Sequence, residues 1–553
     1  MKSDNQYTGY KMHYFSLSVV LSLVAYTALA QKDTTRRQTI DITSSYKPVL
    51  RNAVKINFSA TPLNADTTRP VFKYVIPKQN LFYSYQPITL KPLALQMDTS
   101  LDLGLRNYLK LGFGNFSTPY VSAGFSFGDG KKNLLNLYAD YISSRGKIKN
   151  QDYTNLGIKA TGSFFTPKNE LYLGASLNQS DYYLYGYDHN IHNYIKDSIR
   201  QRFQDILLRA GLRNTVSGEY GISYDPNIAV SVFSNKDKLT ESSLIVTAPV
   251  KKQFGDAFAI NIEGKADITT YNTKGQNPDI KLNNNVAQVA ASLVFSSPRF
   301  SINGGIIPTW DNGKFVWLPN VYMQAQLKEK VLMFQAGWVG RYTKNTYRYL
   351  STANPYLLPV KFQLNTKEVE YYGGFKATAG KHFSFNTKAG FLTYNNLPFF
   401  INDTSFNGKG FNISNESRVY DLRLHGDINY IDQDKFTLTA GISFNGYTGM
   451  KDNYKAWNTL PMEINGSFRW WAFKQVLLKS DIYVFGGSNY LDKGNISRSF
   501  NGGTDLSAGV EFKITKMFSA WLDVNNILND KYQRWHNYEV YGLNLLGGLR
   551  IIF

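Results

Sequence analysis

Short segments in which apolar and polar residues alternate follow one another from about residue 106 to the C-terminus. The apolar positions of one segment are Phe436, Leu438, Ala440, Ile442 and Phe444, and threonine, glycine and serine residues lie between them. The segments 171–178 and 258–267 alternate in the same way. Because successive side chains of a β-strand point to opposite faces, this period of two predicts about 22 strands, within a range of roughly 16 to 22.

The connections between these segments are alternately short and long. Very short turns lie at 166–168, 297–299, 328–330, 432–434 and 515–516, and longer polar stretches lie at 185–200, 345–361, 396–415, 487–503 and 528–540. Tight periplasmic turns and long outward loops are typical of outer-membrane barrels. A soluble sandwich also alternates, but lipid is the simplest cover for so many apolar faces. The sequence therefore predicts an all-β fold, a transmembrane antiparallel β-barrel over residues 106–553.

One part of this pattern allows two interpretations. Residues 209–225 fit a single long strand that turns at Asp225-Pro226-Asn227. They also fit a shorter strand with an inner turn at Ser217-Gly218, because glycine and serine favour turns as well. The strand count depends on which turn is used.

The residues before the barrel differ from it in composition. An apolar run at 15–29 ends in Ala28-Leu29-Ala30, which predicts a signal peptide over residues 1–30; the run is too short for a membrane anchor. Residues 31–105 are rich in proline and basic residues and show little alternation. We expect this segment to lie in the periplasm or to fill the barrel lumen.

The composition and net charge of the chain exclude some kinds of chemistry and limit which binding partners we expect. The chain has no cysteine, which excludes disulfides and thiol catalysis, and its formal net charge is +20 at pH 7. No apolar stretch after the N-terminus is long enough for a transmembrane helix. Because the predicted signal peptide implies export from the cytoplasm, we do not expect nucleic acid to be the partner that the basic charge binds. Outer-membrane lipid, the phosphates of lipopolysaccharide and an envelope protein partner are the expected partners.

Apolar and polar residues alternate most clearly at the C-terminus, in residues 541–553. An apolar face comprises Tyr541, Leu543, Leu545, Leu549, Ile551 and Phe553. A terminal Phe on an apolar alternation resembles the signal that the outer-membrane insertion machinery reads. We therefore assign Leu549, Ile551 and Phe553 to an outer-membrane insertion signal, and the insertion machinery becomes an expected partner.

The residues before this strand carry a resemblance to a known family. The stretch 520–532 reads AWLDVNNILNDKY, and it resembles the "NNLFdkkY" loop that precedes the final strand of TonB-dependent outer-membrane receptors. The resemblance implies a 22-stranded barrel. It also implies a plug domain of a size and with motifs that this chain lacks, since only residues 31–105 lie between signal and barrel. Segment 31–105, the loops or a separate protein would then fill the lumen.

Few residues in the sequence suggest a substrate-binding, metal-binding or catalytic site. Arg423, His425 and Asp427 share the polar face of one predicted strand, where they fit either a network of paired charges or a substrate-binding site. His189 and His192 have no fixed third ligand, so no metal or other cofactor is predicted. No nucleophile lies beside a histidine by motif, and the protein is not expected to be an enzyme. The aromatic residues of 182–194, with Trp535 and Tyr538, suit a membrane girdle or a surface that grips sugars or a partner.

Two hypotheses of function follow from these features. The first is a receptor-like outer-membrane barrel for capture or passage of a solute, with a plug that another chain can supply. The second is a structural subunit of an outer-membrane assembly or secretion complex that transports nothing itself. The missing plug strengthens the second hypothesis.

Overall fold

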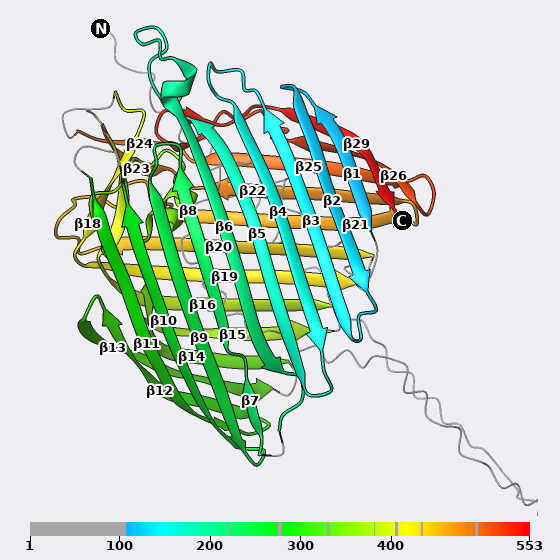
Figure 1. The fold of residues 1–553 in the computed structure, drawn as a ribbon, viewed down its shortest axis with the longest axis vertical. Coiled ribbons are helices and arrows are strands. Elements are labelled where there is room, and N and C mark those ends of the chain that lie inside the picture. Colours follow the sequence, from blue (N-terminus) through cyan, green and yellow to red (C-terminus); the bar gives the residue numbers. More distant parts are fainter. Residues whose placement is uncertain are drawn as a thin grey trace, which may run out of the picture. The chain divides into compact units, whose positions relative to one another are not determined.

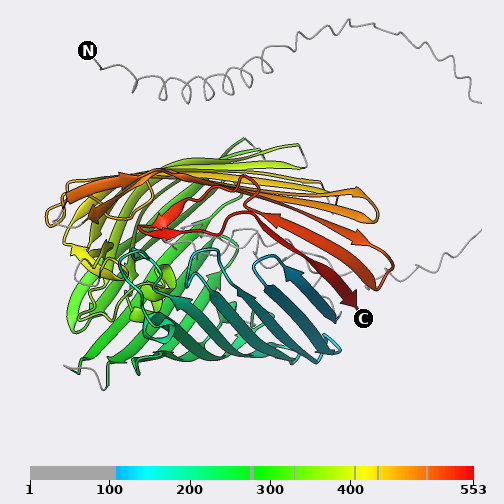
Figure 2. The same ribbon diagram turned by 90° about the horizontal axis from the view of Figure 1, so that it is seen from above.

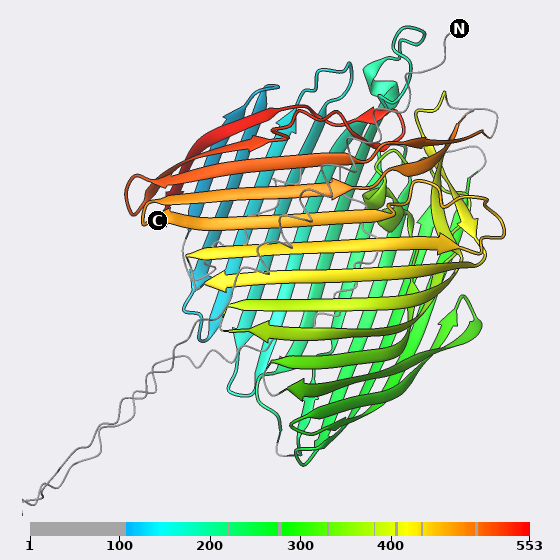
Figure 3. The same ribbon diagram turned by 180° about the vertical axis from the view of Figure 1, so that it is seen from behind.

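One closed antiparallel sheet forms the body of the molecule (Figures 1 and 3). A computed structural model describes residues 107–553 except 219, 275–278, 329–330, 381, 404–406, 433–434 and 493–495. The first strand, β1 (Tyr108–Gly114), pairs with the last, β29 (Asn544–Ile552), in antiparallel register. The barrel predicted from the alternation is confirmed. The regions predicted as signal peptide and basic segment lie outside the described residues.

The barrel has 22 strand positions, at the upper end of the predicted range. Its sheet holds 23 strands, but β7 (Ile222–Tyr224) and β8 (Asn227–Asn235) follow one another along β9 (Thr240–Phe254) and share one position. Pro226 separates them, because proline has no backbone N–H to continue a ladder. The chain reverses at residues 215–221, so the inner turn was the correct alternative.

The other barrel strands follow one another around the sheet in chain order. They are β2 (Thr118–Gly128), β3 (Asn133–Ser144), β4 (Tyr153–Phe165), β5 (Asn169–Tyr183), β6 (Arg200–Asn214), β10 (Phe258–Asn272), β11 (Lys281–Ser296), β12 (Phe300–Asp311), β13 (Lys314–Lys328), β14 (Leu332–Thr343), β15 (Thr366–Ala379), β16 (Phe383–Asn395), β19 (Val419–Asp432), β20 (Phe436–Thr448), β21 (Met462–Phe473), β22 (Val476–Phe485), β25 (Gly503–Lys513) and β26 (Phe518–Asn525).

The two faces of the sheet match the alternation in the sequence. Apolar side chains such as Leu173, Ile262 and Leu422 are exposed on the outer face, as in barrels whose outer face contacts lipid. Acidic side chains such as Glu370 and Asp421 are buried on the inner face and pair with basic ones. No helix in the described part of the chain is long and apolar enough to span a membrane.

The two rims differ, as the connection lengths predict. The connections between described strands at one rim are short, with up to seven residues at 215–221. Asn107 and Phe553 lie at the same rim, and their backbones exchange hydrogen bonds of 3.1 and 3.0 Å. This rim faces the periplasm by the rule for outer-membrane barrels. The long connections gather at the opposite rim (Figures 1 and 2). They contain the 3-10 helix η2 (Lys196–Ile199), the helix α2 (Tyr347–Ala353), and the hairpins β17 (Leu397–Asn402)–β18 (Phe411–Glu416), β23 (Ser488–Asp492)–β24 (Ile496–Phe500) and β27 (Gln533–Trp535)–β28 (Tyr538–Glu539).

One residue of the final segment departs from its predicted face. Tyr541 precedes β29 and is buried, with its ring edge-on to Phe116 and Tyr153 at 5.6 and 5.5 Å between centroids. It was wrongly placed on the lipid face, because a period of two applies only where the backbone is extended. Leu549 and Phe553 are exposed as predicted.

Candidate functional site

Three outward loops meet through a cluster of tyrosines. Tyr185 lies in the β5–β6 loop, Tyr356 in the β14–β15 loop and Tyr538 in the β26–β29 loop. The rings of Tyr356 and Tyr538 stack with centroids 3.4 Å apart, and Tyr185 packs edge-on against both, at 6.0 and 4.8 Å. Burial raises the pKa of Tyr185 to about 12 and those of Tyr356 and Tyr538 well above their usual range. All three hydroxyls therefore stay neutral at physiological pH.

The strand positions from which these three loops start show that their contact spans the barrel mouth. Counted along the 22 strand positions, the three loops are separated by eight, eight and six positions. Loops that start about a third of the circumference apart reach one another only across the barrel mouth. We call the three loops and the β17–β18 hairpin the cap, because together they cover the outward opening.

The cap has an apolar core of its own. Tyr347, Leu357 and Trp535 are fully buried, and Trp535 packs between Phe400 and Phe411 of the β17–β18 hairpin. The core residues come from five loops and the strand ends beneath them, and they are Leu184, Tyr185, Tyr187, Ile199, Phe203, Phe233, Leu239, Tyr271, Tyr347, Leu350, Ala353, Tyr356, Leu357, Val360, Phe400, Phe411, Trp535 and Tyr538. The aromatic residues predicted to form a girdle or a gripping surface thus include several that hold the cap together.

The β14–β15 loop, residues 344–365, is the part of the cap that enters the lumen, and we call it the inward loop. Its helix α2 starts after Thr346, whose side chain accepts a hydrogen bond from the Tyr349 backbone N–H at 3.1 Å. The helix ends before Asn354, and Pro355 follows it. One face of the helix is buried in the cap core, which includes Leu350.

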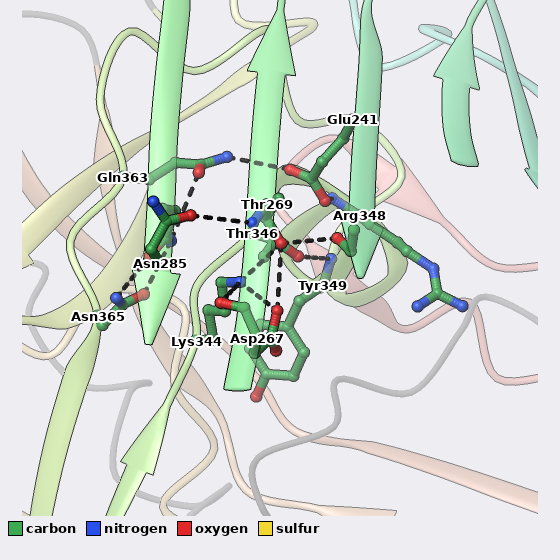
Figure 4. Close-up of polar contacts among 12 residues, drawn as sticks. Glu241, Asp267, Thr269, Asn285, Lys344, Thr346, Arg348, Tyr349, Gln363 and Asn365 are labelled. Atoms are coloured by element: carbon green, nitrogen blue, oxygen red, sulfur yellow. Dashed lines mark hydrogen bonds and ion pairs between the residues drawn. The ribbon is translucent and has the colours of Figure 1, made fainter. Parts of the chain in front are cut away.

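The carboxylate of Glu241 on β9 holds the start of this helix (Figure 4). One oxygen accepts from the backbone N–H of Tyr347 at 2.7 Å, and the other accepts from that of Arg348 at 3.2 Å. The side-chain amide of Gln363, near the end of the inward loop, donates a third hydrogen bond at 3.1 Å. A single buried carboxylate therefore fixes both ends of the loop to β9, which lies five and six strand positions from β14 and β15.

Two ion pairs add to this attachment. Lys344 pairs with Asp267 on β10 and also donates to the Thr269 hydroxyl at 2.6 Å (Figure 4). Burial lowers the pKa of Lys344, and Asp267 opposes that shift. Arg348 donates to Asp205 on β6 at 2.7 Å. β10 and β6 lie four and seven strand positions from β14, so the contacts require the loop to extend inward past several neighbouring strands.

An amide pair fixes the end of the inward loop. The Asn365 side chain exchanges hydrogen bonds of 2.9 and 2.7 Å with that of Asn284 on β11, and it donates to Asp311 on β12 at 2.7 Å. We call Glu241, the two ion pairs and this amide pair the latch.

The wall next to the inward loop carries the residues predicted as substrate-binding candidates. Arg423, His425 and Asp427 all lie on the inner face of β19. His425 contacts Asp427 at 2.8 Å and the Ser443 hydroxyl at 2.8 Å. Arg423 donates to Asp421 at 3.1 Å. The predicted network of paired charges is present, and Arg423 also borders a cavity.

This cavity lies between the inward loop and the β15–β20 wall. It measures about 60 Å³, and its lining includes Tyr349 of α2, Glu368, Tyr394, Phe399, Arg423 and Tyr447. Arg423 is held in place by the Asn445 side chain at 2.9 Å and the Tyr394 hydroxyl at 2.6 Å. The lining thus combines aromatic rings with polar groups that the wall fixes, as binding pockets commonly do.

Solved structures of two receptors and one iron transporter have a fold similar to that of this chain. The FrpB iron transporter of Neisseria meningitidis has a TM-score of 0.63 at 10% identity, over 81% of each chain. A variant of the ferric enterobactin receptor of Pseudomonas aeruginosa, in complex with enterobactin, has a TM-score of 0.61 at 12% identity, again over 81% of each chain. The ferripyoverdine receptor of the same organism has a TM-score of 0.60 at 11% identity, over 81% of this chain and 72% of its own.

The chain has the barrel fold of the TonB-dependent outer-membrane receptors. The resemblance seen at residues 520–532 is confirmed at the level of this fold, and a large barrel with an apolar outer face is consistent with the predicted outer-membrane location. No family model matches the sequence, and no curated protein is recognisably similar to it.

The residues that attach the inward loop to the barrel wall were not predicted. Glu241 and Asp267 each look like one more polar residue on a strand's inner face. Their partners lie about a hundred and about eighty residues further along the chain. Only their closeness to the outward strand ends gives a local signal, because that is where loops and strands can meet.

Proposed function

We propose that the protein is a receptor-like outer-membrane barrel that captures a solute beneath the cap and lets it pass when the inward loop moves. The observation that supports this most is the latch. Besides its apolar contacts in the cap core, this loop is held to the inner face of the wall by a few charged and amide side chains. Such polar contacts can be exchanged for water or solute at modest cost.

The plug is the second part of the proposal. The TonB-dependent receptors that the sequence resembles carry a plug domain, and residues 31–105 precede the barrel in this chain. We propose that this basic segment, or a separate envelope protein, fills the periplasmic half of the lumen. The outer face would contact lipid and lipopolysaccharide, and the insertion machinery would recognise Leu549, Ile551 and Phe553.

Conductance of the full-length protein in planar bilayers tests the proposal. The wild-type protein should be closed or nearly so. The double variant Tyr356→Ala and Tyr538→Ala, which removes the stacked rings at the centre of the cap, should show frequent openings when residues 31–105, the proposed plug segment, are also deleted. Deletion of residues 31–105 alone should leave the barrel closed by the cap, and Tyr220→Ala is a second control, because Tyr220 is an exposed tyrosine of the short-turn rim. A double variant without residues 31–105 that folds and remains as closed as the wild type would contradict passage through this mouth.

The second hypothesis, a structural subunit, has one observation in its favour. The cap core is packed like the interior of a soluble domain, with several aromatic side chains fully buried. A cap that never opens suits an anchor for partner proteins. Native purification distinguishes the two: a protein that stays sealed in all cap variants and co-purifies in fixed stoichiometry with envelope proteins would favour the structural role.

A further inference from the structure

The cavity beside Arg423 has a lining whose charges are already balanced. The Arg423 guanidinium pairs with Asp421, and the Glu368 carboxylate pairs with Arg341 of β14. Each charged group that borders the cavity therefore has its counter-ion in the barrel wall. A solute that carried its own charge into this cavity would be desolvated without gaining an unpaired opposite charge. The lining therefore favours a neutral group.

Aromatic rings and hydroxyls make up much of the remaining lining. Tyr349, Tyr394, Phe399 and Tyr447 line the cavity, and threonine hydroxyls such as that of Thr343 lie among them. Rings of this kind offer flat apolar faces, while tyrosine and threonine hydroxyls both donate and accept hydrogen bonds. A sugar ring presents the matching chemistry, with C–H groups on its faces and hydroxyls around its edge.

The size of the cavity is also consistent with a ring of that kind. A buried water needs roughly 10–15 Å³ of such space, so about 60 Å³ holds about four to six waters. Liquid water occupies about 30 Å³ per molecule, and this number of waters therefore corresponds to roughly 120–180 Å³ of displaced solvent. The upper end of this range is close to one monosaccharide unit, and the whole range is far too small for an oligosaccharide.

We propose that this cavity binds one neutral sugar unit of a larger solute. The inference rests on the proposed function, because it names the class of solute that the receptor barrel would capture. Tyr349 and Leu350 belong to the inward loop, and Thr343 stands at its base. Binding therefore contacts the movable element directly, and occupancy changes the equilibrium between its latched and open positions.

Binding of linear glucose, mannose and galactose trisaccharides to the full-length protein in detergent tests the proposal by saturation-transfer NMR and calorimetry. At least one trisaccharide should bind. Tyr349→Ala should raise its Kd at least tenfold, and Tyr349→Phe, which keeps the ring, should stay within about threefold of the wild type. Tyr220→Ala, at the other end of the barrel, should leave the Kd unchanged.

Several results would overturn this assignment. They are a lack of binding by all three trisaccharides, an equal Kd in the Tyr349→Ala variant, and preferential binding of a uronate trisaccharide or of 2,3-dihydroxybenzoate at this cavity. The bilayer experiment separates this failure from that of the proposed function. Cap variants that conduct while no neutral sugar binds would leave passage intact and reject the sugar class. Sugar binding without conductance in any variant would support the site and reject passage.

Discussion

Replacement of Glu241 by alanine is the most direct test of the latch. The Glu241 side chain is 1% exposed, and its carboxylate accepts from two backbone N–H groups at the start of α2 and from Gln363. Alanine removes all three hydrogen bonds at once. The two N–H groups then remain buried without an acceptor unless the inward loop leaves its place.

The size of the effect follows from these contacts. Hydrogen bonds to charged groups contribute about 1.5–3 kcal/mol each, but three bonds to one carboxylate do not add fully. A loss of about 3–4 kcal/mol in the free energy of loop opening is therefore expected for Glu241→Ala. Since about 1.4 kcal/mol is a factor of ten, the open fraction should rise by roughly two to three orders of magnitude. The ion pairs and the cap core still favour the latched position.

Labelling of a single cysteine can measure this opening, because the natural chain has none. Ser351 on α2 is 2% exposed, and Ser351→Cys places a small thiol where a maleimide reaches it only after the loop has moved. The labelling rate should rise about 10²- to 10³-fold with Glu241→Ala and less with Glu241→Gln, which keeps one acceptor.

Glu170→Ala is the matched control for this experiment. Glu170 is 5% exposed and pairs with Arg213 on the neighbouring strand, away from the inward loop. Its replacement should cost stability without changing the labelling rate at position 351. If Glu241→Ala and Glu170→Ala label equally fast, the latch does not control the loop and the reasoning is refuted.

Three further predictions concern other parts of the structure. Lys344→Met and Asp267→Asn should each increase the rate of hydrogen exchange in residues 344–365. The increase in the double variant should be smaller than the sum of the two single increases, and additive increases would contradict coupling through this buried pair. Burial lowers the pKa of His536 to about 4, below the unfolded value near 6.5, and its ring stacks on Tyr490 at 3.7 Å. The unfolded form thus binds more protons than the folded form between pH 4 and 6.5, so the contact of His536 with Tyr490 should weaken as the pH falls from about 6.5 to 4. Hydrogen exchange around this contact should become faster over that range in the wild type and should not depend on pH in this way in a His536→Phe variant. Deletion of Phe553 should reduce the amount of protein in the outer membrane by cell fractionation, and unchanged levels would argue against the insertion signal.

The barrel could be predicted from the sequence because its signals are local. A strand that faces lipid on one side and the lumen on the other must alternate, as Leu422 and Leu424 do with Asp421 and Arg423. Turn lengths then show on which rim the chain reverses tightly. Neither signal requires knowledge of which residues meet in space, apart from neighbouring strands.

The cap and latch could not be predicted in this way, because they depend on contacts between distant loops. Tyr185 and Tyr538 are separated by more than three hundred residues, and their sequence surroundings do not indicate that they touch. Tyrosine-rich loops are equally compatible with a membrane girdle. Local patterns also misplaced Tyr541, since the strand period was extended into a segment where the chain is not extended.

The contrast between wall and cap identifies the part of the molecule that can move. Each barrel strand is bonded along its length to a neighbour on either side, so moving one strand breaks many hydrogen bonds together. The inward loop is held to the wall by Glu241, two ion pairs and an amide pair at separate points, and its apolar side chains pack in the cap core. A segment that is attached to a rigid frame at separate points can change position together with the cap core without breaking the strand ladders of that frame. The barrel therefore supplies the path, and the attachments of the inward loop set how often that path is open.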